Sequence, residues 1–90
     1  MQTPGFILLV RDRRDSDAAM RVGFTVTRKI GGSVVRNRMK RRFRALAREI
    51  VPVKGFAGSD HVMIGRARGI ERAFSLLRSE LAGALDQLRK

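Results

Sequence analysis

The sequence contains no cysteine and a single histidine, His61, among 90 residues. Without thiolates the chain forms no disulfide bond, binds no zinc through cysteine and has no cysteine nucleophile. One imidazole at the start of a predicted strand has no second histidine with which to form an acid–base pair. We therefore expect His61 to be structural and no residue of this chain to be catalytic.

Acidic residues are scarce, and long apolar runs are absent. Eight Asp and Glu residues stand against 20 Lys and Arg, which gives a formal net charge of +12 and a pI near 11.9. No segment approaches the roughly 20 consecutive apolar residues of a membrane-spanning helix. No signal peptide or lipidation pattern opens the chain, so we expect a cytoplasmic protein. A polyanion offsets the self-repulsion of so much positive charge, and nucleic acid is the leading candidate.

The length and an apolar content of 43% predict a single folded domain over residues 1–90. Strands are predicted at residues 6–10, 21–27 and 61–64, with the first two forming an antiparallel hairpin across the polar loop 12–19. Ser33 is predicted to cap a helix that Pro52 and Gly55 end, and a second amphipathic helix is predicted from Ile70 onward. The order β-β-α-β-α predicts an α+β fold, a sandwich with a mixed sheet.

The first predicted helix combines an apolar stripe with a basic surface. The stripe consists of residues that recur at every third or fourth position: Val35, Met39, Phe43, Leu46 and Ile50. A helical projection places another set on the opposite side, namely Arg36, Asn37, Lys40, Arg41, Arg44 and Arg48, while Arg38 and Arg42 flank the stripe. The sequence thus predicts a helix with one buried side and one strongly basic side.

This basic surface has few acidic neighbours in the sequence. Residues 18–48 contain no Asp or Glu, and Glu49 is the single acidic residue between Ser33 and Ile50. A merely solvated helix surface normally interleaves Glu with Lys or Arg, so the pattern favours an external anion. Arginine binds phosphate bidentately and stacks on bases, and Asn37 can pair with phosphate, 2′-OH or a base edge. RNA therefore fits at least as well as DNA.

Two other motifs were weighed as ligand sites. Asp12, Asp15 and Asp17 match no calcium-loop spacing and are interleaved with arginines. Gly31-Gly32 lacks the spacing of a phosphate-binding Walker loop, and we expect a turn before the helix. The sequence therefore predicts no metal site on this chain.

The segment RVGFTVTRKIGGSVVRNRMKRRFR, from Arg21 to Arg44, resembles the signature of the bacterial ribonuclease P protein family. It combines a strand, a Lys-x-Gly turn and an arginine-rich helix containing Arg-Asn-Arg, and weaker similarity extends over nearly the whole chain. The resemblance implies an α/β sandwich with an unusual left-handed crossover. It also implies an RNA-binding surface made of Arg28, Lys29, Arg36, Asn37, Arg38, Lys40, Arg41, Arg44, Arg48 and Arg66.

The function expected of this chain follows from the same resemblance. Proteins of this family assist a catalytic RNA that removes the 5′ leader from precursor tRNA, and Mg²⁺ is held mainly by the RNA, with none expected on the protein. The expected partners are the catalytic RNA and precursor tRNA, with no membrane and no DNA. The leader is expected to lie in a cleft formed by Ile7, Leu9, Asn37, Lys40 and Arg44.

One departure from the family pattern lies at the start of the sequence. Family members usually begin with a basic, aromatic-containing helix before the first strand, whereas here Met1 closely precedes Phe6. Either the sequence starts late or this version of the protein is shortened, and in both cases leader affinity is the property that loss of the helix would affect most.

Two other classes of protein remain open. One is a ribosomal or ribosome-assembly protein that binds RNA without an enzymatic role. The other is a DNA-binding regulator that reads the major groove with the basic helix, although base-edge selectivity and a dimer surface do not show in the sequence. Relative affinities for precursor tRNA, duplex RNA and duplex DNA at one salt concentration distinguish the three classes.

Overall fold

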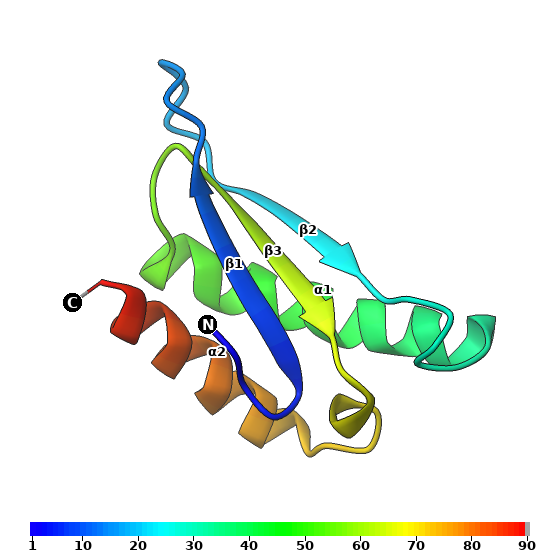
Figure 1. Ribbon diagram of the computed structural model, residues 1–90. Coiled ribbons are helices and arrows are strands. Elements are labelled where there is room, and N and C mark those ends of the chain that lie inside the picture. The colour runs from blue at the N-terminus through cyan, green and yellow to red at the C-terminus, as the bar shows by residue number, and fades with distance from the viewer. Residues whose placement is uncertain (90) are drawn as a thin grey trace.

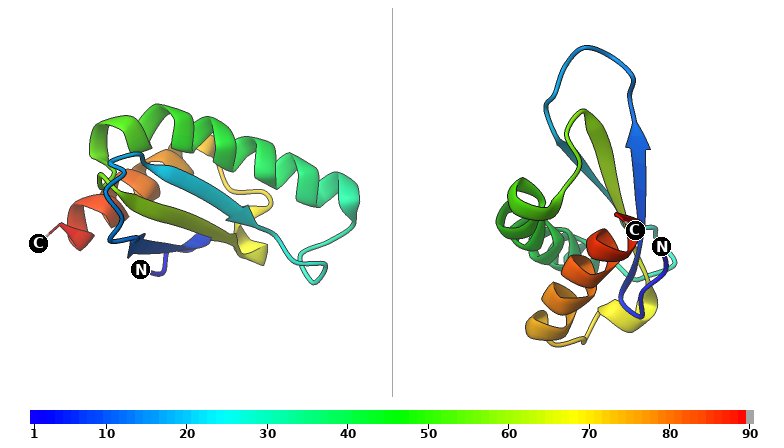
Figure 2. Two further views of the ribbon diagram at one scale, coloured as in Figure 1. Left: turned by 90° about the horizontal axis from the view of Figure 1, so that it is seen from above. Right: turned by 90° about the vertical axis from the view of Figure 1, so that its left-hand side faces the viewer.

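The computed structural model describes residues 1–89 as a three-stranded mixed sheet with two α-helices. In chain order the elements are β1 (Phe6–Asp12), β2 (Arg21–Thr25), α1 (Ser33–Lys54), β3 (Ser59–Gly65), the short 3₁₀ helix η1 (Ala67–Gly69) and α2 (Phe74–Leu88). Both α-helices cover the same face of the sheet, and within residues 1–89 the other face is open (Figures 1 and 2). This two-layer arrangement confirms the predicted α+β fold class.

The strand order is β1-β3-β2, so the predicted hairpin between β1 and β2 is wrong. The last strand lies between the first two, antiparallel to β1 and parallel to β2. The connection from β1 to β2 wraps around the residue before β3, because Arg13 N–H donates to the Gly58 carbonyl (3.1 Å) and Gly58 N–H donates to the Ala18 carbonyl (2.9 Å). These contacts keep β1 and β2 apart, so each of them pairs with β3 and not with the other.

Helix α1 connects the parallel strands β2 and β3 on the covered face of the sheet. In Figure 1 both strands run towards the lower right, α1 returns behind them, and β3 lies on the lower-left side of β2. This geometry is a left-handed crossover, the opposite of the hand that parallel strands normally adopt. The topology implied by the family resemblance is thus present.

Helix α1 differs from the prediction at both ends. Gly32, in an extended conformation, occupies the N-cap position, and Ser33 is the first helical residue rather than a cap. The helix continues through Pro52 and ends at Gly55, whose N–H donates to the Val51 carbonyl (2.7 Å). A Cβ atom at Gly55 would lie 2.5 Å from that oxygen, so glycine alone fits this close approach. Pro52 is tolerated because it costs one hydrogen bond in the last turn.

Helix α2 starts one turn later than predicted, at Phe74 rather than near Ile70. The segment before Phe74 instead contacts Arg42 of α1, whose guanidinium donates to the carbonyls of Gly69 (3.4 Å), Ile70 (3.3 Å) and Arg72. Strand ends also shift: β1 and β3 are longer than predicted, and β2 is shorter.

A single core lies between the sheet and the helices. Phe6 and Phe43 meet edge to face at its centre, with ring centroids 5.7 Å apart. The largest buried apolar side chains come from every layer: Phe6, Leu8, Phe43, Leu46, Met63, Leu77, Leu81 and Leu85. Leu88, the last residue of α2, is 40% exposed because it lies at the helix end. This core holds α1 in a fixed orientation, which determines the side chains it exposes.

Candidate nucleic-acid interface

The basic side chains of α1 lie outside the core. Met39, Phe43 and Ile50 are buried, and the helical repeat turns the intervening residues away from the sheet. The predicted RNA-binding residues on this helix are therefore exposed or half-buried: Arg36, Asn37, Arg38, Lys40, Arg41, Arg44 and Arg48. The predicted amphipathic character of α1 is confirmed.

These cations have almost no internal counter-charge. Within residues 1–89, Arg38 is the only predicted RNA-binding cation with a carboxylate closer than 4.0 Å. That contact, 3.9 Å from Arg38 Nη1 to Glu71 Oε1, lies at the exposed surface, where an ion pair contributes little. The carboxylates that do pair closely bind other residues, as in Lys54 with Asp86 (3.0 Å). The surface of α1 is thus available to an external anion.

A polar depression lies along α1 between its basic side chains. It has a volume of about 490 Å³ and is lined by Val34, Asn37, Lys40, Arg41 and Arg44. Three of these, Asn37, Lys40 and Arg44, belong to the predicted leader cleft. Three cations and one amide around one hollow supply hydrogen-bond donors of the kind that phosphate oxygens and 2′-hydroxyls bind.

An apolar groove adjoins this depression and was not foreseen from the sequence. It has a volume of about 350 Å³ between β2 and α1, and its lining consists of Met20, Val22, Phe24, Arg44, Ala47, Arg48, Val51 and Pro52. Arg44 belongs to both hollows, and its guanidinium carbon lies 5.9 Å from the centre of the Phe24 ring. Met20, an apolar residue beside a polar loop, is the one hint of this groove in the sequence. The groove itself forms only because β2 and α1 lie side by side in the fold.

The other predicted cations lie where β2 and β3 end. Arg28 and Lys29 are exposed in the turn after β2, which the Ile30 N–H closes by donating to the Thr27 carbonyl (3.0 Å). Arg66 follows β3, and its Nη1 donates to the carbonyl of Thr3 (2.8 Å). Arg66 therefore holds the N-terminal segment against the sheet.

The two halves of the predicted leader cleft do not meet in one hollow. Leu8 is buried towards the helices, so the alternating Ile7 and Leu9 point to the open face of the sheet. Leu9 is 50% exposed there. The depression on α1 contains neither residue. The structure thus separates Ile7 and Leu9 from Asn37, Lys40 and Arg44.

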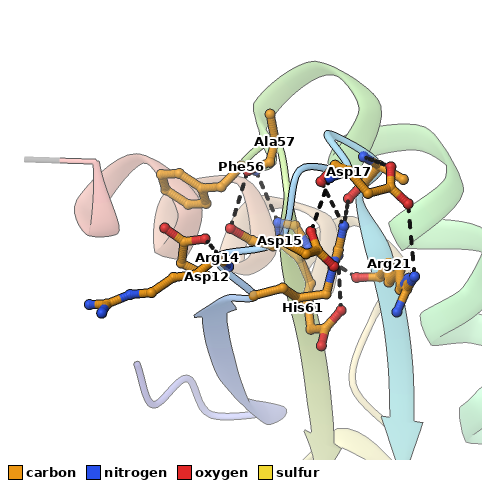
Figure 3. A network of polar contacts seen from close by, with 12 residues as sticks. Asp12, Arg14, Asp15, Asp17, Arg21, Phe56, Ala57 and His61 are labelled. Carbon is orange, nitrogen blue, oxygen red and sulfur yellow. Dashed lines mark hydrogen bonds and ion pairs between the residues drawn. The ribbon is translucent and has the colours of Figure 1, made fainter.

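The acidic loop between β1 and β2 is a structural unit organised by Arg13. Arg13 donates to Asp15 Oδ2 (3.1 Å), to Asp60 Oδ1 (3.1 Å) and to two loop carbonyls. Asp15 and Asp17 also accept backbone N–H groups two residues further on, and they lie close together in Figure 3. The hydrogen bond from Arg13 holds the pKa of Asp15 below its ordinary value. These carboxylates are therefore occupied by the protein itself.

His61 is fully buried and connects three segments (Figure 3). Its Nε2 accepts the Phe56 N–H (3.0 Å), so Nδ1 carries the proton and donates to the Arg21 carbonyl (3.1 Å). Both ring nitrogens are engaged, which agrees with the structural role predicted for this residue. In the part of the chain that the structure describes, no three His, Cys, Asp or Glu side chains are grouped to hold a metal ion.

Comparison with known proteins assigns the family. The sequence profile of the family Ribonuclease P matches residues 1–89. The ribonuclease P protein component of Erythrobacter litoralis is 53% identical over 87 residues, which are 97% of this chain and 70% of that protein. The chain belongs to the ribonuclease P protein family. The resemblance inferred from residues 21–44 is therefore confirmed.

Other ribonuclease P proteins extend beyond the part that this chain matches. The component from Paramagnetospirillum magneticum is 42% identical, with 94% of this chain and 66% of that protein covered. The component from Caulobacter vibrioides is 43% identical, with 88% of this chain and 53% of that protein covered. This chain thus spans between about half and 70% of the length of these ribonuclease P relatives.

Solved ribonuclease P proteins share the fold. The protein from Thermotoga maritima superposes with a TM-score of 0.79 at 29% identity, covering 97% of this chain and 80% of the other. The protein from Staphylococcus aureus gives a TM-score of 0.75 at 21% identity over all of this chain and 79% of the other, which shows the fold alone. No helix within residues 1–89 is long and apolar enough to cross a membrane.

Proposed function

We propose that this chain acts as the protein subunit of ribonuclease P in the cytoplasm and binds the catalytic RNA through the basic side of α1. The observation that carries the proposal is a set of α1 cations that, within residues 1–89, have no carboxylate within 4.0 Å, namely Arg36, Lys40, Arg41, Arg44 and Arg48, while Arg38 has a single exposed contact with Glu71. Phosphates of a folded RNA would replace the missing counter-charge and release bound counterions. Arg28 and Lys29 extend the same surface beyond the start of α1.

The 5′ leader of precursor tRNA is the second proposed ligand. The depression around Asn37, Lys40 and Arg44 has the donors for the backbone of a single strand. Ile7 and Leu9 on the open face of the sheet give a separate apolar surface for unpaired bases. The leader thus contacts α1 through phosphates and the sheet through bases.

The proposed contribution to catalysis is positioning rather than chemistry. The single histidine is buried with both nitrogens bonded, so this chain offers no imidazole as a general base. The donor set for a resident metal is also poor, because the Asp15 carboxylate already accepts from Arg13 and from a backbone N–H group, and the Asp17 carboxylate accepts from the Ala19 N–H. The Mg²⁺ ions that promote hydrolysis are proposed to be held mainly by the RNA, while the protein orients the substrate.

Cleavage at low magnesium tests this function. A 5′-extended precursor tRNA is incubated with a bacterial ribonuclease P RNA at a Mg²⁺ concentration at which the RNA alone is slow, with and without the protein. We expect the protein to restore cleavage at the mature 5′ end and to be inert without the RNA. The proposal fails if neither this chain nor a version extended upstream of Met1 accelerates cleavage.

A further inference from the structure

We propose that the apolar groove between β2 and α1 binds one unpaired base of an RNA strand whose backbone lies on α1. The groove is the hollow lined by Met20, Phe24, Arg44 and Arg48 together with the apolar residues between them. This inference rests on the proposed RNA binding by α1. It assigns a role in RNA binding to β2 and to Met20, which are not part of the α1 surface.

The lining suits a flat aromatic ligand. Val22 and Phe24 of β2 form one wall, and Val51 and Pro52 of α1 contribute to the other. Phe24 is half-buried, and Met20 at the rim is 36% exposed. The volume of about 350 Å³ lies within the range of small-molecule pockets. Bases bind such surfaces by stacking and with little dependence on sequence.

The charged rim supplies partners for the phosphates beside that base. Arg44 and Arg48 lie one helical turn apart on α1, so their side chains are neighbours on one side of the helix. Within residues 1–89 neither has a carboxylate within 4.0 Å. An apolar floor below two guanidinium groups that lack carboxylate partners matches the two parts of a nucleotide.

The groove also continues the proposed RNA surface. Arg44 lines both the groove and the polar depression that contains Asn37 and Lys40. A strand whose phosphates lie in the depression therefore reaches the groove without crossing any other part of the protein. The two hollows together follow the same side of α1.

An acidic amphipathic peptide is the rival occupant, since it also combines apolar and anionic groups. A helical peptide needs apolar contacts that repeat over several turns. Here the apolar lining stops at Arg44, and beyond it the depression is lined by Asn37, Lys40 and Arg41, with Val34 its one apolar member. That polar continuation favours a nucleotide strand over a peptide.

Abasic scanning of a short single-stranded RNA tests the inference on the full chain. Each RNA carries one nucleotide without its base, and its dissociation constant is compared with that of the intact RNA at fixed salt. We expect one or two positions at which base removal weakens binding by roughly tenfold, because stacking of one base is lost. Removal of the base elsewhere has little effect.

Two variants with the same added charge locate the effect. Met20→Glu places a carboxylate at the groove, and Leu76→Glu places one on the exposed side of α2, where Leu76 is 47% exposed. Thermal unfolding confirms that both are folded. The position-specific abasic penalty disappears in Met20→Glu and persists in Leu76→Glu if the groove holds the base.

The alternative results separate the two proposals. If intact RNA binds with normal salt dependence but no abasic position weakens it, the base site is overturned while RNA binding by α1 stands. If no salt-dependent RNA binding is measured, the proposed function fails first. If a glutamate-rich amphipathic peptide binds the wild-type chain and not Met20→Glu, and no abasic penalty exists, the groove is a peptide site and our inference is wrong.

Discussion

Individual arginines in this chain divide by the groups they contact. Arg13, Arg42 and Arg66 donate to carbonyls or carboxylates inside the molecule and hold segments together. Arg41 and Arg44 on α1 have no such carboxylate partner within residues 1–89. The same side chain therefore serves folding in one position and ligand binding in another.

Arg41→Ala is expected to weaken binding to the catalytic RNA and to lower the salt dependence. The reason is the loss of about one phosphate contact, which reduces the slope of log K against log salt concentration by roughly one. Affinity measured at several salt concentrations gives the slope. Arg78→Ala is the matched control, because Arg78 loses the same charge but pairs with Glu49 on the α2 side. Equal slopes for all three proteins would contradict phosphate contact at Arg41.

Asp15→Asn is expected to lower the free energy of unfolding at neutral pH and to have no effect in strong acid. The Arg13 hydrogen bond holds the pKa of Asp15 below its unfolded value, so the ionised carboxylate stabilises the folded state. That stabilisation is fully present above the unfolded pKa, about 4, and is lost as the pH falls through the folded pKa. Urea unfolding of both proteins between pH 7 and 2 measures the difference. A difference that grows on acidification would reverse the assigned sign.

Among the elements, α1 and β2 are predictable because their signals are local. The apolar repeat of Met39, Phe43 and Ile50 defines which side of α1 is buried, and the exposed cations follow from the same helical geometry. Most of the candidate RNA surface was therefore visible in the sequence. Helical geometry predicts the relative positions of residues only when they lie on the same helix.

Contacts between distant segments were not predictable. The insertion of β3 between β1 and β2 depends on backbone pairing across more than fifty residues, as in Phe6 with Gly65. The segment before α2 contacts Arg42, almost thirty residues earlier than Ile70. The groove likewise requires β2 and α1 to meet. Such partners carry no periodic signal in the sequence.

Arg42→Met is expected to lower the free energy of unfolding by about 2–3 kcal/mol, because half-buried carbonyls after η1 lose a charged donor. The methionine keeps most of the apolar stem, so packing changes little. Urea unfolding measures the loss. Arg78→Met, on the exposed side of α2, is the control and should change stability by less than about 0.5 kcal/mol. Equal effects of the two substitutions would show that Arg42 does not hold this connection.

For the whole molecule, charge opposes folding and favours RNA binding. The net charge of +12 repels itself in the folded state, whereas the same charge attracts a polyanion. Added salt screens both effects. Stability and affinity are therefore coupled to salt in opposite directions.

Raising the salt concentration from about 20 mM to 200 mM is expected to increase the melting temperature of the free protein and to weaken RNA binding by at least tenfold. Thermal unfolding followed by circular dichroism and filter binding in the same buffers measure both quantities. Repeating the titration with an anion that binds proteins more weakly than chloride distinguishes ionic screening from specific anion binding. A melting temperature that falls with salt would show that internal ion pairs, such as Lys54 with Asp86, outweigh repulsion.

The central position of β3 bears on synthesis at the ribosome. Translation runs from the N-terminus, so β1, β2 and α1 leave the exit tunnel before β3, the strand that joins β1 to β2, has emerged. Until residue 65 has emerged, β1 and β2 each expose unpaired backbone edges, and α1 has an incomplete sheet beneath it. The sheet of this protein therefore cannot complete its backbone pairing until β3 has left the tunnel, whatever the order in which the other elements emerge.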